Sequence, residues 1–157
     1  MNSTFALVPI ELFDHREPSA YLPAKRSYLR RVDIVVQKFD SLGVVGLYAV
    51  GAADFIAQKL FDLVEYASNN SGETLFALVE DKRLFVVALR DLDVRLANVF
   101  EVDSDEDIVY FILIAVQNTG LDIGQTRVKL SSSPIRHSLI SLMNRYIDTE
   151  PMSVSFG

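Results

Sequence analysis

Between residues 74 and 102 the sequence carries three runs of β-favouring residues separated by short polar turns. Only Asp81 and Lys82 lie between the first run (74–80) and the second (83–89), and the third (94–102) follows the polar segment 90–93. A connection of two residues joins antiparallel strands, whereas parallel strands need a crossover of about a dozen residues or more. This region therefore predicts a three-stranded antiparallel meander.

A helix is predicted directly after the meander, at about residues 104–119. Ser104 and, three residues later, Asp107 form a variant of the capping box, and acidic side chains are favourable at a helix N-terminus. Gly120 supplies a left-handed C-terminal cap. Apolar residues recur at helical spacing between these two signals and predict one buried stripe: Ile108, Phe111, Ile112, Ala115 and Val116.

The rest of the chain predicts strand, helix and strand. Residues 126–131 alternate like a strand, Pro134 suits the first turn of a helix that runs to about Ile147, and residues 153–156 form a last short strand. Right-handed crossovers place the later strands parallel beside the meander. The predicted fold class is α/β (α+β) with a mixed sheet, a β-β-β-α-β-α-β unit of the ribonuclease H-like or actin-like type over residues 74–157.

The first half carries weaker signals. Residues 5–8 predict a short strand that enters a helical turn at 9–13, and residues 14–28, with Pro18 and Pro23, predict a loop or lid. Residues 32–39 and 44–50 predict two strands joined across 40–43, and residues 52–66 predict an amphipathic helix. Residues 67–73 are rich in serine and asparagine and form the best candidate for a linker.

Composition excludes several classes of function. The chain of 157 residues has no cysteine and two histidines, which excludes disulfides, thiolate metal sites and cysteine nucleophiles and favours a cytoplasmic protein. With 21 acidic and 15 basic residues the net charge is −6, the wrong sign for a protein that neutralises phosphates, so nucleic acid is not an expected partner. The apolar run 108–116 is far shorter than the about 20 residues that span a bilayer, and no signal peptide is recognisable.

Several segments together resemble a known family: FALVPIELF at residues 5–13, DIVYFIL at 107–113, TGLD at 119–122, Tyr146, and VSF at 154–156. The sequence is similar to the C-terminal part of an uncharacterised bacterial family of the Bacteroides group, a domain of unknown function described as having an actin-like ATPase fold. The resemblance implies that residues 1–73 are the end of a first actin-like subdomain and residues 74–157 a second subdomain. Actin-like proteins bind nucleotide between two lobes, and half of that cleft is expected to be missing.

The chemistry that such folds support is expected to be absent. Ribonuclease H-like nucleases hold two metal ions with carboxylates on the first and fourth strands, but residues 75–79 contain no acidic residue and the fourth strand ends in serines. Actin-like ATPases use glycine-containing hairpins that let backbone N–H groups approach phosphate, and the predicted hairpin contains no glycine. His137 has no acidic residue at helical spacing to orient it. We therefore expect no catalytic residues, no metal site and no cofactor.

Two functions remain from this reasoning. The favoured one is a non-catalytic, pseudo-ATPase domain that binds a protein partner or self-associates, because apolar side chains at Phe55, Leu60 and Phe61 and the lid otherwise lack a partner. The alternative is a divergent nucleotide-binding protein or weak ATPase that binds ATP and Mg²⁺. Only under this alternative are the hairpin and the serine run cofactor-binding residues, although serines before a helix more often cap it: Glu80, Asp81, Lys82, Ser131, Ser132 and Ser133.

Overall fold

The computed structural model describes residues 4–24, 29, 32–51, 54–70, 72–134 and 136–152. Contacts divide the chain into two compact units, Met1–Phe61 and Asp62–Gly157, and the helix α2 (Asp54–Ala67) begins in the first and ends in the second. Five predictions lie wholly or partly outside the described residues: the whole strand at 153–156, residues 25–28 of the lid, the helix start at 52–53, residue 71 of the linker and residue 135 of the last helix. The assignment of residues 1–73 and 74–157 to successive actin-like subdomains stays a prediction.

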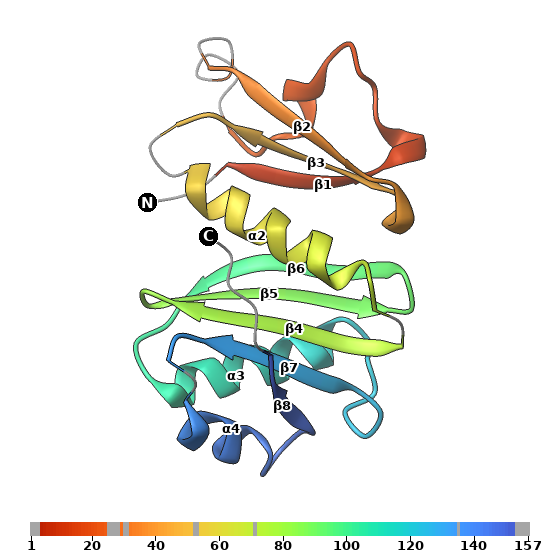
Figure 1. Ribbon diagram of the computed structural model, residues 1–157. Coiled ribbons are helices and arrows are strands. Elements are labelled where there is room, and N and C mark those ends of the chain that lie inside the picture. The colour runs from red at the N-terminus through yellow and green to blue at the C-terminus, as the bar shows by residue number, and fades with distance from the viewer. Residues whose placement is uncertain are drawn as a thin grey trace. The chain divides into compact units, whose positions relative to one another are not determined.

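The first unit is a three-stranded antiparallel sheet in the order β1-β3-β2 (Figure 1). Its strands are β1 (Phe5–Pro9), β2 (Ile34–Phe39) and β3 (Val44–Ala49), joined by the short 3-10 helices η1 (Ile10–Leu12), η2 (Pro18–Tyr21) and η3 (Asp40–Leu42). Gly43 ends η3 with φ of 65°, a left-handed conformation that glycine adopts without strain. The predicted strands and the turn between them are confirmed.

Both faces of the central strand β3 are buried. Val45, Leu47 and Ala49 share one core cluster with Leu22 and Leu29, which come from the predicted lid and the residues after it. On the other face Phe61 of α2 packs edge-on against Phe39 and Tyr48, with ring centroids 5.8 Å apart in each pair. The lid segment therefore contributes to the core of the first unit.

The prediction that apolar side chains of α2 lack a partner is wrong for two of three residues. Leu60 is 0% exposed and Phe61 is 1% exposed, because both pack inside the folded chain. Phe55 is 46% exposed but also makes contacts within the chain. These side chains no longer support a need for a protein partner.

The second unit is a five-stranded mixed sheet in the order β6-β5-β4-β7-β8. The strands β4 (Glu73–Glu80), β5 (Arg83–Arg90) and β6 (Asp93–Glu101) form the predicted antiparallel meander. The strands β7 (Arg127–Ser132) and β8 (Thr149–Pro151) extend it in parallel from β4. The predicted strands are confirmed as far as β7, whereas β8 at 149–151 was not predicted and the strand predicted at 153–156 lies outside the described residues.

Two helices lie on the same face of this sheet, α3 (Asp105–Asn118) and α4 (His137–Met143) (Figure 1). The Ser104 hydroxyl accepts a hydrogen bond from Asp107 N at 3.1 Å, Asp107 Oδ2 accepts one from Asp103 N at 2.9 Å, and Gly120 has φ of 74°, so both predicted helix ends are confirmed. Alternate residues of β4 and β5 pack against the helices in one aliphatic cluster, which includes Leu75, Ala77, Leu84, Val86, Ile108 and Ile112.

Candidate functional site

The β4–β5 hairpin has an unusual turn. Glu80 pairs with Arg83, and the two residues between them, Asp81 and Lys82, have φ of 48° and 61°. Positive φ at both central positions is the type I′ geometry, which normally selects Asn-Gly or Asp-Gly. A lysine in this conformation carries backbone strain that a glycine would avoid. The turn is therefore built for a tight hairpin, with side chains where a phosphate-binding hairpin has glycine.

The serine run lies at the same end of the sheet as this hairpin. β4 and β7 are parallel, with Leu78 opposite Ser131 and Val79 opposite Ser132, so both strands finish together. Ser131 is 5% exposed. The carboxyl ends of parallel strands are the usual place for a ligand in open α/β sheets. The structure places two runs of three residues, far apart in the sequence, at this one end of the sheet: Glu80, Asp81, Lys82 and Ser131, Ser132, Ser133.

Two predictions about the serine run are wrong. Ser131 and Ser132 belong to β7, and α4 begins only at His137, with no side-chain cap at Arg136. Pro134 follows a cis peptide bond in the connection and is not in the first turn of the helix. Ser132 Oγ donates to Pro134 O at 3.0 Å and accepts from Arg136 N at 3.2 Å. The Ser132 hydroxyl therefore stabilises the connection between β7 and α4 and does not cap the helix.

Charged residues that sequence reasoning did not connect with the hairpin also lie here. Asp103 Oδ1 is 4.0 Å from Lys82 Nζ, and Asp105 forms an ion pair with Arg136. The backbone hydrogen bond from Val102 N to Lys82 O, 2.9 Å long, places the start of α3 beside the turn. The sequence signal for this proximity is the meander itself, since two successive hairpins return the third strand's end to the first turn.

The hollow beside the hairpin has a volume of about 220 Å³. This is below the roughly 300–1,000 Å³ of typical small-molecule sites. Acidic side chains outnumber basic ones in its lining, which comprises Asp81, Lys82, Arg83, Glu101, Val102 and Asp103.

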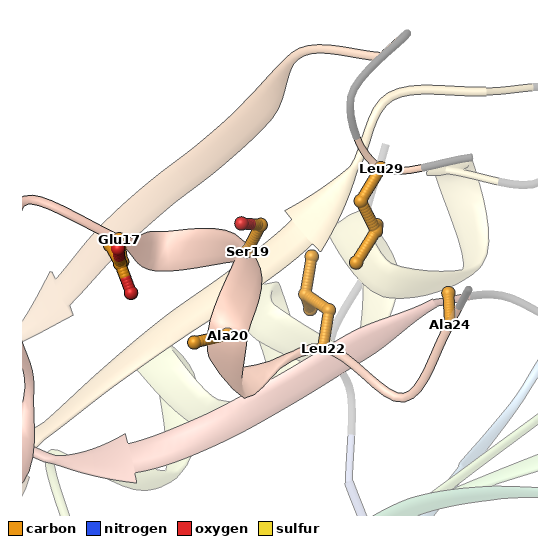
Figure 2. Close-up of a pocket in the computed structure, with 6 residues that line it drawn as sticks. All are labelled: Glu17, Ser19, Ala20, Leu22, Ala24 and Leu29. Atoms are coloured by element: carbon orange, nitrogen blue, oxygen red, sulfur yellow. The ribbon is translucent and has the colours of Figure 1, made fainter. Parts of the chain in front are cut away.

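The second hollow lies in the first unit and measures about 260 Å³. Its walls come from η2 and the residues on either side of it, and Figure 2 shows the side chains of Leu22 and Leu29 pointing toward one another. Glu17 and Ser19 are the polar residues in the lining, which also contains Ala20 and Ala24. No pair of groups for acid–base chemistry gathers at this hollow, among the residues described.

Across the described part of the chain, no three histidine, aspartate or glutamate side chains lie where they would hold one metal ion. The pKa of Asp14 is lowered by hydrogen bonds from the Arg16 side chain and backbone. Asp14 and Arg16 are exposed neighbours in a loop, so this shift reflects a local ion pair.

Of the helices described, none is both long and apolar enough for a membrane span.

Comparison with solved structures identifies the fold. A crystal structure of a Bacteroides thetaiotaomicron protein with an actin-like ATPase fold and unknown function matches with a TM-score of 0.72 and 16% sequence identity. The match covers 94% of this chain and 64% of that chain, so this chain spans less than two thirds of that protein's length. The likeness shows an actin-like ATPase fold, as the sequence resemblance implied.

Other comparisons add less. Pelota from Archaeoglobus fulgidus matches with a TM-score of 0.34 and 13% identity, over 73% of this chain and 36% of that chain. No curated protein matches. The family model described as "Protein of unknown function (DUF3822)" matches residues 1–149, almost the whole sequence. The chain therefore belongs to the DUF3822 family of proteins of unknown function.

Proposed function

We propose that this chain is a non-catalytic, pseudo-ATPase domain of actin-like fold that acts by binding protein. The observation that carries the proposal is the charge arrangement at the β4–β5 hairpin. Lys82 already has the Asp103 carboxylate beside it, Arg136 is paired with Asp105 near the start of α3, and acidic side chains outnumber basic ones in the lining of the hollow. Such surroundings repel the phosphates of a nucleotide.

The geometry of the hairpin supports the same conclusion. Phosphate-binding hairpins bring backbone N–H groups close to the ligand, and glycine makes this approach possible because it has no side chain. Here Asp81 and Lys82 occupy the turn, and the Ser132 hydroxyl is engaged with the backbone of Pro134 and Arg136. The Ser132 hydroxyl therefore has no hydrogen left to donate to a phosphate, because it donates to Pro134 O.

Support for protein binding comes from the outer edge of the second sheet. The strand β6 has nine residues and is an edge strand of the sheet. Edge strands present backbone N–H and C=O groups on which another strand can pair. Beside it, Tyr110 of α3 is 59% exposed and packs on Phe111, which stacks on Phe100 of β6. A protein partner or a second copy would cover these groups. A sequence without cysteine suits a cytoplasmic location for this function.

Calorimetric titration of the purified protein with ATP and Mg²⁺ tests the proposal. We expect no heat of binding at millimolar ATP, and the same result for Asp81→Ala and Lys82→Ala. Circular dichroism of each variant confirms that the fold is retained. Micromolar binding that disappears in Lys82→Ala would instead establish the alternative, a divergent nucleotide-binding protein or weak ATPase. That alternative is favoured only by the gathering of the hairpin and serine residues at one end of the sheet.

A further inference from the structure

We propose that β6 is a self-association edge, on which β6 of a second copy of this chain pairs antiparallel about Asn98. The inference deepens the proposed function, on which it rests, by naming the partner. It stands on three features of the strand: the direction of its backbone groups, the pattern of its side chains, and the aromatic stack beside it.

The outward direction of the backbone follows from two hydrogen bonds. Val99 N donates to the side-chain oxygen of Asn98 at 2.8 Å, so this N–H does not take part in the ladder with β5. Val102 N donates to Lys82 O at 2.9 Å, so this backbone N–H points inward, toward the β4–β5 hairpin. Because backbone groups alternate along an antiparallel strand, Ala97 and Val99 offer their N–H and C=O groups to an additional strand. In the single chain, the Asn98 side chain occupies one of these donors.

The side chains of β6 complement a second copy in one register. When Asn98 faces Asn98 of the second copy, Leu96 faces Phe100 and Ala97 faces Val99. Arg95, whose Nε lies 3.1 Å from Asp93 Oδ2 within the chain, then faces Glu101 of the second copy as a second acidic neighbour. Apolar residues then meet apolar residues and opposite charges meet, arrangements that stabilise cross-strand pairs. Shifting the centre by one residue to Ala97 places Asp93 opposite Glu101 and Leu96 opposite Asn98. The sequence of the strand therefore selects the register centred on Asn98.

The hydrogen-bond pattern agrees with this register. Ala97 and Val99 become hydrogen-bonded partners, since both point outward, and Val99 N exchanges the Asn98 side chain for a backbone oxygen. The released amides of the two Asn98 side chains face one another in a non-hydrogen-bonded pair, in which Cα atoms are about 4.5 Å apart. Phe100 stacks on Phe111 with centroids 4.8 Å apart, and this stack lies beside the proposed contact between the two β6 strands. We expect a weak dimer, because one pair of edge strands forms a small contact beside the about 1,200–2,000 Å² that stable interfaces bury.

Cysteine cross-linking tests the register, because the chain has no cysteine of its own. In the Asn98→Cys dimer the Cα atoms of the two cysteines would lie within the separation of about 4.4–6.8 Å that a disulfide requires. We expect the oxidised variant to form a covalent dimer about tenfold or more faster than Leu92→Cys, an exposed control at the β5–β6 turn. Faster cross-linking of Ala97→Cys than of Asn98→Cys would overturn the register.

Charge reversal tests the pairing without new covalent bonds. Arg95→Glu or Glu101→Arg alone places like charges opposite one another twice per dimer, and we expect each to raise the Kd of the dimer about tenfold in analytical ultracentrifugation. The double variant restores opposite charges and should return the Kd to within about threefold of the original. A double variant as weak as the single variants would overturn the predicted contact.

The tests separate this inference from the proposed function. A strictly monomeric chain at millimolar concentration, without cross-linking of Asn98→Cys, would overturn the pairing of β6 while the ATP titration still stands. Nucleotide binding in that titration would overturn the proposed function, and a cross-linked Asn98→Cys dimer would nevertheless establish the edge.

Discussion

The two units bury their sheets in different ways. In the first unit one ring, Phe61, covers a face of β3 and contacts Phe5, Phe39 and Tyr48, with centroids 5.8–6.4 Å apart. In the second unit a continuous aliphatic cluster joins α3, α4 and four strands. Packing that depends on one large ring concentrates stability at a single residue, whereas a cluster of many small contacts distributes it. Mutations in the two units should therefore differ in cost and in tolerance.

Phe61→Ala should have the largest effect. Removing a buried phenylalanine costs about 3–5 kcal/mol of the free energy of unfolding, and the cavity here opens between three aromatic rings that cannot easily fill it. Urea unfolding followed by circular dichroism measures the loss. A cost below about 2 kcal/mol would contradict the concentration of stability at this ring.

Ile112→Ala sharpens the comparison from the second unit. Ile112 is 0% exposed, and substitutions of this kind cost about 2–5 kcal/mol. Its aliphatic neighbours can move partly into the space, so we expect a value in the lower half of this range. The same urea titration compares it with Phe61→Ala, and a larger loss for Ile112→Ala would reverse the comparison.

Gly46→Ala tests the close packing against Phe61. A Cβ atom at Gly46 would lie 2.7 Å from Phe61 Cε2 and 2.9 Å from Phe39 Cε2, so both rings must shift. We expect a loss of about 1–3 kcal/mol, as for other overpacked cores.

Gly124→Ala is the matched control for Gly46→Ala, because the nearest contact of its Cβ is 3.4 Å and the position has no positive φ. Its unfolding free energy should change by less than about 1 kcal/mol. In a Phe61→Leu background Gly46→Ala should cost less than in the original chain, which thermal unfolding of the four variants can measure. Equal costs in both backgrounds would show that the ring is not the obstacle.

Ser104→Ala removes the N-cap of α3 and should cost about 1 kcal/mol, since Asp107 N loses its hydrogen-bond acceptor. Ser104→Asp, which keeps an acceptor at the cap, is the control and should retain most of the stability. Chemical denaturation distinguishes the two. Because the cap is local, we expect this loss of stability to be independent of how either core is packed.

Lys82→Gly should have the smallest effect, and it should stabilise. Lys82 has φ of 61°, and glycine removes the strain of this conformation at a smaller cost in chain entropy, for a net gain of about 0.5–1 kcal/mol. Asp81→Gly should gain less, because aspartate tolerates the left-handed region better than lysine does. The midpoint of thermal unfolding measures both. A destabilised Lys82→Gly would indicate that the Lys82 side chain holds the turn.

The strands of the first half show where local sequence signals were sufficient. The strands β1, β2 and β3 and the helix α2 were predictable from local alternation and helical spacing, as were the meander, the cap at Ser104 and Gly120 in the second half. These signals act between residues a few positions apart. Short-range sterics and hydrogen bonding determine these signals, so the elements can be predicted without knowing which strands pair.

Only the tertiary structure decided the rest. Ser131 and Ser132 extend β7 because the parallel partner β4 continues beside them, which overrides the local capping signal. Leu60, Phe61 and the lid residue Leu22 are buried by the tertiary fold. Asp103 lies beside Lys82 because two successive hairpins return the chain to the first turn. The sequence by itself determined the order of the elements as far as α4 and both ends of α3. Register, burial of both sheet faces and the position of β6 at the edge of its sheet depend on pairing between distant segments, whose free energy no local pattern contains.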